Sequence, residues 1–253
     1  MRNWYTVGLL ATIVMPTRVP PRRGLKGTWL GRYEATFRMS DRSRIRCRLE
    51  DSGDLISVYV DRDYGSSQIA WSELTSIIDI GSTVGAFTIW AARQSPRAKM
   101  VAVEPNPEVF PFLVDNIRRN DLSDRVTTIE AAIGSAPGIA AIEDDRAFST
   151  LVRVVPMGVG RGPRVRMLTL EQLFDETHTS SCDLLKIDCE GGEYDILFTA
   201  PGQLLRRIRA IVCEYHPTPE HDPAELIEFL SDAGFQIDAD RTPIGFVRAK
   251  RSM

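Results

Sequence analysis

From residue 76 onward, short apolar segments alternate with helical ones, and this order constrains the fold more than any other feature of the sequence. Apolar strands are expected over 76–80, 99–104, 125–133, 182–188 and 209–215. Helices are expected over 86–93, 107–120 and 223–233, and the tail beyond them is typical of a closing antiparallel pair. Because consecutive parallel strands need a long crossover, usually a helix, this pattern predicts an α/β fold with a parallel sheet covered on both faces.

The N-terminal part follows a different pattern. Residues 1–43 are rich in proline and glycine and show no sustained period, which predicts an arm or a loosely packed cap. In "RIRCRL" (44–49) apolar and basic residues alternate as in a half-exposed strand, "DSGD" (51–54) provides a turn, and "LISVYV" (55–60) reads as a returning strand. We therefore expect an arm over 1–43 and one domain over 44–253, made of a hairpin at 44–60 and a Rossmann-like core at 76–253.

Charge and cysteine content exclude some classes of protein. The net charge of the 253 residues is -3, so there is no general attraction to nucleic acid or to a membrane surface. The longest apolar run, 7–15, is too short to span a bilayer. The four cysteines form no C-x-x-C pair, which is typical of reduced thiols in a cytoplasmic protein.

A glycine turn in "IIDIGSTVGAF" (77–87) follows the first core strand and opens a helix. Gly81 allows a tight turn, Gly85 allows close helix packing, and the helix start is expected to offer free amides to an anion. Glu104 ends the next strand, where a carboxylate can accept both ribose hydroxyls of a nucleotide. Asp79 precedes the first glycine, and its charge would repel a diphosphate but suit the ammonium group of a methionine moiety. The balance favours S-adenosylmethionine over a dinucleotide.

Acidic side chains gather where two central strands end. Asp188 ends the strand 182–188, and Glu190 follows at the start of the next helix. Glu214 and His216 alternate with a tyrosine, so both point to one face at the same rim. Ligands of open parallel sheets bind beyond this edge, so Asp188 and Glu190 are expected to face a ligand. For Glu193 and Asp195 the simplest role is capping the helix, and for Lys186 neutralising a neighbour.

Six segments in order resemble the FkbM-type methyltransferases, a branch of the class I S-adenosylmethionine-dependent fold. The resemblance covers about 45–237 and is carried by "DIGSTVGAFT", "VAVEPNPEVFPFLVDNIRRN", "EAAIG", "LTLEQL", "DLLKIDCEGGEYDIL" and "CEYHP". It implies a doubly wound, mostly parallel seven-stranded sheet with an antiparallel last strand. It also implies methyl transfer, most often to a hydroxyl of a small metabolite or sugar, as in secondary metabolism. Ser82 and Thr83 depart from the Ala-Asn pair that is common in that family.

The same resemblance assigns residues to the cofactor. By match to the motifs, S-adenosylmethionine is expected to contact Asp79, Gly81, Ser82, Thr83, Gly85, Glu104, Pro105, Asn106, Ala132 and Asp188.

Hydroxyl methylation benefits from a base that removes the acceptor proton. His216 is the first candidate, with Glu214 or Asp188 orienting it or serving instead. These three side chains can also hold a divalent ion, but their spacing does not require one and no metal is assigned. The segment 143–167 lacks a period and is predicted to be a functional lid or a disordered stretch. Acceptor contacts are expected from Glu190, Ser149, Thr150 and Arg153.

Two other functions stay open on the sequence. One is a nicotinamide-dependent oxidoreductase on a similar sheet, against which the absent third glycine and Asp79 count. The other is a non-catalytic binding module whose basic segment, with ten lysines and arginines over 16–48, docks an acidic partner. The expected partner is a small hydroxyl-bearing acceptor, with no nucleic acid and no membrane. The oligomeric state is not specified, and a homodimer stays open.

Overall fold

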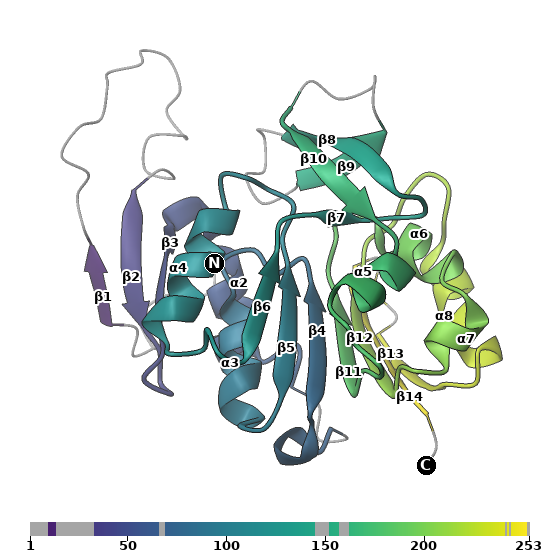
Figure 1. The fold of residues 1–253 in the computed structure, drawn as a ribbon, viewed down its shortest axis with the longest axis horizontal. Helices are drawn as coiled ribbons and strands as arrows, with labels where there is room; N and C mark the ends of the chain where they lie inside the picture. Colours follow the sequence, from purple (N-terminus) through teal and green to yellow (C-terminus); the bar gives the residue numbers. More distant parts are fainter. Residues whose placement is uncertain are drawn as a thin grey trace.

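A seven-stranded sheet runs through the centre of the computed structural model (Figure 1), which describes residues 10–13, 33–65, 69–144, 152–156, 162–240, 242 and 244–251. Its strand order is β13-β14-β12-β11-β4-β5-β6. The strands are β4 (Ser76–Ile80), β5 (Lys99–Val103), β6 (Val126–Ile129), β11 (Leu184–Ile187), β12 (Ala210–Tyr215), β13 (Gln236–Ala239) and β14 (Gly245–Lys250). The neighbours β6, β5, β4, β11 and β12 pair in parallel, and β14 pairs antiparallel with β12 and β13. The predicted mostly parallel sheet with an antiparallel last strand is confirmed.

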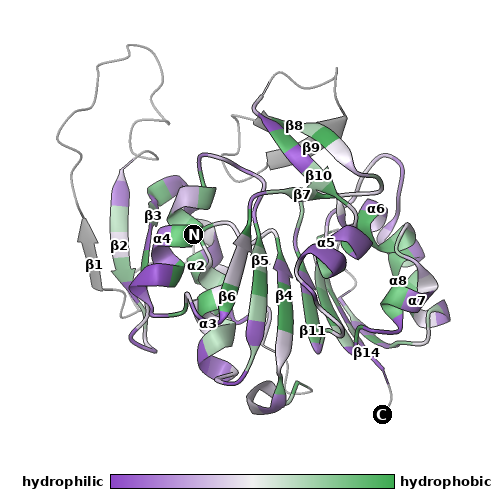
Figure 2. Cartoon of the chain, viewed as in Figure 1, coloured by the Kyte–Doolittle hydropathy of each residue, from purple (hydrophilic) through white to green (hydrophobic). Residues whose placement is uncertain are grey.

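Helices cover both faces of this sheet. One face carries α3 (Ala86–Gln94) and α4 (Phe110–Arg119), and the other carries α5 (Leu170–Glu176), α6 (Glu193–Phe198), α7 (Gly202–Leu205) and α8 (Pro223–Asp232). Side chains of a strand alternate between faces, so Ile77 packs into one hydrophobic cluster and Ile78 into the other. Figure 2 shows the hydrophobic residues concentrated along the central strands and the helix sides that meet them. Burial on two faces explains why these strands read as continuous apolar runs.

The N-terminal part forms a separate antiparallel sheet of β1 (Leu10–Ile13), β2 (Glu34–Arg38) and β3 (Arg44–Arg48). The expected partner strand at 55–60 is wrong, because 49–61 is helical: η2 (Leu49–Ser52), α2 (Gly53–Ile56) and η3 (Ser57–Asp61). Leu55 and Val58, three residues apart, are both buried, which is a helical spacing. The strand paired with β3 instead precedes it, inside the segment predicted to be an arm.

Asn116 of α4 and Asn120, the residue after this helix, hold β3 against the core. The Asn116 side chain accepts from the Arg46 amide (2.7 Å) and donates to the Arg46 carbonyl (2.7 Å), as a neighbouring strand would. Asn120 makes the same pair of bonds with the Arg44 backbone, at 2.9 and 2.8 Å. The second Asn116 donor bond reaches the Val84 carbonyl, next to the glycine turn. The free edge of β3 is therefore paired, and the N-terminal sheet is fixed against α4.

A third, four-stranded sheet stands over the carboxyl edge of the central one (Figure 1). It contains β7 (Ala132–Ile133), β10 (Arg164–Leu168), β8 (Gly138–Asp144) and β9 (Val152–Pro156) in that order. The single strand expected over 125–133 is therefore divided between two sheets. Much of the segment 143–167, expected to be a lid or disordered, belongs to these strands. A short 3-10 turn, η4 (Trp71–Glu73), precedes the core. None of the helices in the described part of the chain has the length and apolar character that crossing a bilayer would need.

Candidate active site

The glycine turn after β4 depends on two residues that cannot carry a side chain. Gly81 has φ of +77°, and a Cβ there would lie 1.8 Å from the backbone oxygen of Asp188. Gly85 has φ of +86°, and a Cβ there would lie 2.8 Å from Leu113 of α4. Only glycine lets the ends of β4 and β11 approach this closely. The first glycine therefore brings the turn and the carboxyl-rich end of β11 together.

Backbone amides of this turn are used inside the protein. Gly81 and Ser82 both donate to the Val103 carbonyl oxygen, at 3.0 and 2.9 Å. The Thr83 amide donates to the Glu104 carboxylate at 2.9 Å. These three turn amides are therefore not free for an anion, and the prediction of free amides at the start of α3 is not tested by them. A diphosphate would have to displace those bonds, whereas a ligand with a cationic amino acid group would not.

Glu104 is held as an acceptor at the end of β5. It is 6% exposed and takes hydrogen bonds from the amides of Thr83 and, at 2.7 Å, Asn106. Burial raises the pKa of Glu104 to about 7, although the two amides act in the opposite direction. Each carboxylate oxygen keeps a second lone pair, so the group can accept from two further donors. This geometry suits the two hydroxyls of a ribose. Pro105 and Asn106 follow half-buried, and Ala132 is buried at the start of β7.

Asp79 has no exposed surface. One carboxylate oxygen lies 3.2 Å from Nζ of Lys186, which is itself 3% exposed, and the other accepts from the Thr88 hydroxyl. Lys186 also donates to the Gly81 carbonyl at 2.7 Å. Asp79 is therefore the ion-pair partner of Lys186, and Lys186 in turn fixes the glycine turn. Because Asp79 is fully buried, its carboxylate does not face a ligand ammonium group in this structure. The neutralising role predicted for Lys186 matches this contact.

Two carboxyl groups meet at the ends of β11 and β12. Oδ2 of Asp188 and Oε2 of Glu214 lie 2.8 and 3.0 Å from the hydroxyl of Tyr64. Burial, and then the charge of Asp188, raises the pKa of Glu214 to about 7. Both carboxyl groups keep some exposed surface. The predicted rim therefore holds Asp188 and Glu214 together, within reach of a ligand.

His216 lies between two glutamates at the same rim. Its Nε2 is 3.4 Å from Glu190 and its Nδ1 is 3.2 Å from Glu193. Burial lowers the pKa of His216, but the hydrogen bond and charge of Glu193, with the charges of Glu190 and Asp188, outweigh it and raise this pKa to about 9. The imidazole is therefore a cation at neutral pH and a poor proton acceptor. The role of first-choice base does not fit this charge state.

Glu193 serves the loop that starts α6. It is fully buried and accepts from the amides of Cys189 (2.8 Å) and Gly191 (2.9 Å). Both amides precede α6, so Glu193 holds the loop before the helix and does not cap the helix as predicted. Asp188, Glu193 and His216 bring possible ligand atoms within 4.8 Å of one another, although the Glu193 oxygens already have these donors.

Sequence reasoning missed two residues of this site, both from the N-terminal segment. Tyr64 was not considered, and Asp54 was assigned to a turn. Burial, and then the charge of Asp188, raises the pKa of Asp54 to about 6. The side chain of Asp54 hydrogen-bonds Thr83. Of the predicted acceptor contacts, Glu190 lies at the rim, Ser149 and Thr150 lie outside the described residues, and Arg153 is in β9.

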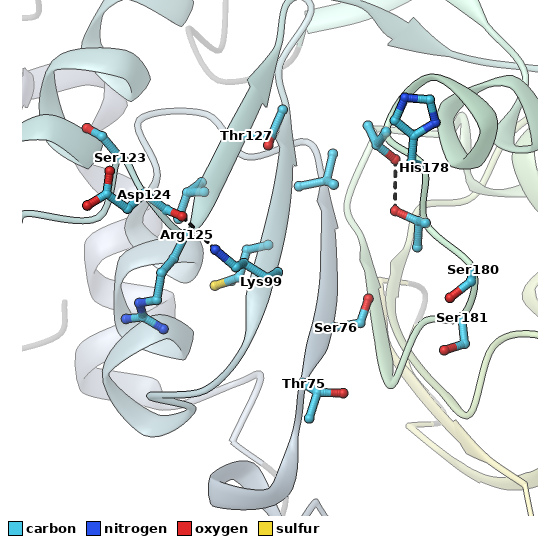
Figure 3. Close-up of a pocket in the computed structure, with 15 residues that line it drawn as sticks. Thr75, Ser76, Lys99, Ser123, Asp124, Arg125, Thr127, His178, Ser180 and Ser181 are labelled. Carbon is cyan, nitrogen blue, oxygen red and sulfur yellow. Dashed lines mark hydrogen bonds between the residues drawn. The ribbon is translucent and has the colours of Figure 1, made fainter.

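A groove of about 430 Å³ lies at the opposite end of the sheet (Figure 3). Its walls come from the first residues of β4, β5 and β6 and from the loop 177–181. Serine and threonine side chains line much of it, and Lys99 donates there to the Asp124 carbonyl oxygen at 2.8 Å. The groove is therefore separate from the rim of Asp188 and Glu214.

Comparison with known proteins identifies the fold and its chemistry. Residues 79–237, more than half of the chain, match the Methyltransferase FkbM domain. The chain belongs to the FkbM methyltransferase family. It is a methyltransferase, and S-adenosylmethionine is its cofactor. The two alternatives, a nicotinamide-dependent oxidoreductase and a non-catalytic binding module, are not favoured.

Relatives of this FkbM-family chain differ in length. The 31-O-demethyl-FK506 methyltransferase FkbM of Streptomyces tacrolimicus is 24% identical over 217 residues, 74% of this chain and 82% of the relative. The AMB antimetabolite synthetase AmbE of Pseudomonas aeruginosa is 25% identical over 71% of this chain, but the match spans 10% of AmbE. Among solved structures, the delta-N METTL16 methyltransferase domain superposes with a TM-score of 0.51 at 16% identity, covering 85% of this chain and 91% of that domain. This last likeness shows the fold alone.

The residues at the carboxyl edge fit S-adenosylmethionine by their chemistry. Glu104 offers an oriented acceptor pair for a ribose, and the turn beside it has its amides satisfied. Asp188, Glu190 and Glu214 give the edge a negative charge that suits a sulfonium and an ammonium group.

Proposed function

We propose that this FkbM-family chain is an O-methyltransferase that methylates a hydroxyl group of a small metabolite or a sugar. The observation that carries the proposal is the pair of partly exposed carboxyl groups of Asp188 and Glu214 around one phenol hydroxyl. A hydroxyl is a weak nucleophile until its proton is removed, and a carboxylate with a pKa near neutrality is suited to accept that proton. Burial raises the pKa of Glu214 to about 7, so it meets this requirement.

The chain's contribution is to position the acceptor and to receive its proton. When bound, S-adenosylmethionine supplies the electrophilic methyl group for an in-line displacement. The ionised Glu214 accepts the proton of the acceptor hydroxyl as the new carbon–oxygen bond forms, and Asp188 adds negative charge beside it. Glu104 holds the ribose hydroxyls and so fixes the position of the nucleoside. His216 acts as a cation that keeps Glu190 in place.

A relative's name supports the same class of acceptor. The similar protein of Streptomyces tacrolimicus is named a 31-O-demethyl-FK506 methyltransferase, which describes transfer to an oxygen. We include secondary metabolism and a cytoplasmic location in the proposal. The free thiols of all four cysteines support that location.

Tritium transfer from labelled S-adenosylmethionine to a panel of hydroxylated metabolites and sugars tests the proposal. We expect a methyl ether product and a loss of about 10²- to 10⁴-fold in kcat for Glu214→Gln, the usual contribution of a general base. His216→Ala should keep the acidic limb of the pH profile, because the imidazole is not the base, but move it to higher pH, because the His216 cation lowers the pKa of Glu214. Asp195→Asn, an exposed change on α6, serves as the matched control. Methylation of nitrogen or carbon in the same panel, with no ether formed, would contradict the proposal.

A further inference from the structure

Tyr64 comes from a segment that precedes the family match at 79–237, yet it reaches the centre of the candidate site. It follows η3, and the residue before it, Asp63, is bonded both to the core and to η3. Arg248 of β14 donates to the Asp63 carbonyl oxygen at 3.0 Å, and the Ser57 hydroxyl donates to the Asp63 carboxylate at 2.7 Å. The backbone beside Tyr64 is thus held from both sides.

The ring of Tyr64 is fixed as firmly as its backbone. It is 4% exposed and makes edge contacts with Phe87 of α3 and Phe246 of β14, each at 5.2 Å between centroids. The ammonium group of Lys186 lies 5.4 Å from the ring centre. A ring enclosed in this way can move its hydroxyl very little. The position of the oxygen between the two strand ends is therefore determined by packing.

The hydroxyl has one proton and two carboxyl neighbours. Burial, and then the charges of Asp188 and Glu214, raises the pKa of Tyr64 well above 10, so the phenol keeps its proton. It can therefore donate its proton to Oδ2 of Asp188 (2.8 Å) and Oε2 of Glu214 (3.0 Å), which share it. The charge of Asp188 raises the pKa of Glu214, and the hydrogen bond from Tyr64 lowers it.

We propose that Tyr64 is a positioning residue of this active site, whose hydroxyl holds the Asp188 and Glu214 carboxyl groups side by side and favours the ionised form of Glu214. Its consequence for catalysis rests on the proposed function, since an ionised Glu214 is the group that receives the acceptor proton. The N-terminal segment before the family domain then completes the site.

Other charged groups around Glu214 favour or oppose its ionisation. Lys186 and the His216 cation favour it, while Asp188 opposes it, as does Glu190 by its negative charge. Asp54 adds a further negative charge near Asp188. All of these groups stay in place when only the Tyr64 hydroxyl is removed. A shift in the titration of Glu214 after that change therefore reports the shared hydrogen bond.

The test is a ¹³C NMR titration of glutamate carboxyl groups in the free protein, with the Glu214 signal assigned by its loss in Glu214→Gln. Tyr64→Phe keeps the buried ring and removes the donor, so we expect the midpoint of Glu214 to rise by about one pH unit. The matched control is Tyr194→Phe, a ring that is 1% exposed and whose hydroxyl has no hydrogen-bond partner among the described residues. An unchanged midpoint in a folded Tyr64→Phe protein that still binds S-adenosylhomocysteine would overturn the proposal.

A second readout separates this inference from the proposed function. If hydroxyl methylation is observed, the acidic limb of its pH–activity profile should shift to higher pH in Tyr64→Phe, and the activity should recover at high pH. If methyl transfer goes to another atom while the Glu214 midpoint still rises, the positioning role of Tyr64 stands and the proposed function fails. If methyl ethers are formed but neither the titration midpoint of Glu214 nor the acidic limb of the pH–activity profile changes in Tyr64→Phe, the positioning role fails and the proposed function stands.

Discussion

Replacing Asp79 by asparagine separates two roles for the residue that opens the glycine turn. The side chain keeps its size and loses only its charge. Asp79 is fully buried, 3.2 Å from the buried ammonium group of Lys186. Removing one partner of a buried ion pair usually costs about 3–5 kcal/mol, because the other charge is left uncompensated. Lys186 keeps the Gly81 carbonyl at 2.7 Å and Asp188 at 3.7 Å, so we expect the lower end, about 3 kcal/mol.

Urea unfolding followed by circular dichroism measures this loss directly. Asp195→Asn is the matched control, since Asp195 is exposed and the same chemical change there should alter the free energy of unfolding by less than about 0.5 kcal/mol. A change below about 1 kcal/mol in Asp79→Asn, together with a large loss of affinity for S-adenosylmethionine, would refute the structural role. That result would return Asp79 to the direct contact with the ammonium group that the sequence suggested.

Three further substitutions, one of them with a control substitution, test the residues that hold the cofactor and the backbone around the site. Glu104→Gln should weaken S-adenosylmethionine binding by about ten- to a hundredfold in calorimetry, because an acceptor oriented by two amides becomes a partial donor. Gly81→Ala should lower the free energy of unfolding by more than about 2 kcal/mol, because the left-handed backbone is strained and the Cβ meets a backbone oxygen of β11. Gly53→Ala, where nothing lies within 4 Å of the new Cβ, should not lower it. Asn116→Ala removes three hydrogen bonds and should cost about 2–4 kcal/mol in the same denaturation assay.

The central sheet could be predicted because its strands are buried on both faces and separated by helices. Strands such as 99–104 and 209–215 are then mainly apolar runs, which a single sequence shows clearly. The region 49–61 could not be read in the same way. Its apolar residues Ile56, Val58 and Val60 alternate as in a short strand, whereas Leu55 and Val58 have a helical spacing, and tertiary packing decides between the two.

The candidate site was predicted only as far as local patterns reach. Glu104, Asp188 and Glu214 were found because each ends a recognisable strand at one edge of the sheet. Tyr64 was missed because its partners lie 124 and 150 residues away, and no local pattern marks it. His216 was found, but its charge depends on glutamates that fold around it, so its protonation state could not be read from the sequence.

We expect the acidic rim to favour the cofactor over its product in a pH-dependent way. S-adenosylmethionine carries a sulfonium charge that S-adenosylhomocysteine lacks. Burial first, then neighbouring negative charges, raises the pKa of Glu190 and Glu214 to about 7 and that of Asp54 to about 6. These groups gain negative charge as the pH rises from 6 to 8, while His216, with its pKa raised to about 9 by the glutamates despite burial, stays a cation.

The preference for the sulfonium over the neutral thioether should therefore grow with pH. We expect the ratio of the two affinities, measured by calorimetry, to be about three- to tenfold larger at pH 8 than at pH 6, the effect of roughly one added charge at a partly solvated edge. In the double variant Glu190→Gln, Glu214→Gln the ratio should vary much less with pH. A constant ratio in the unmodified protein would mean that these carboxyl groups do not act on the sulfonium. The rim would then serve only the acceptor, because the electrostatic reason for placing acids beside a cationic methyl donor would be gone.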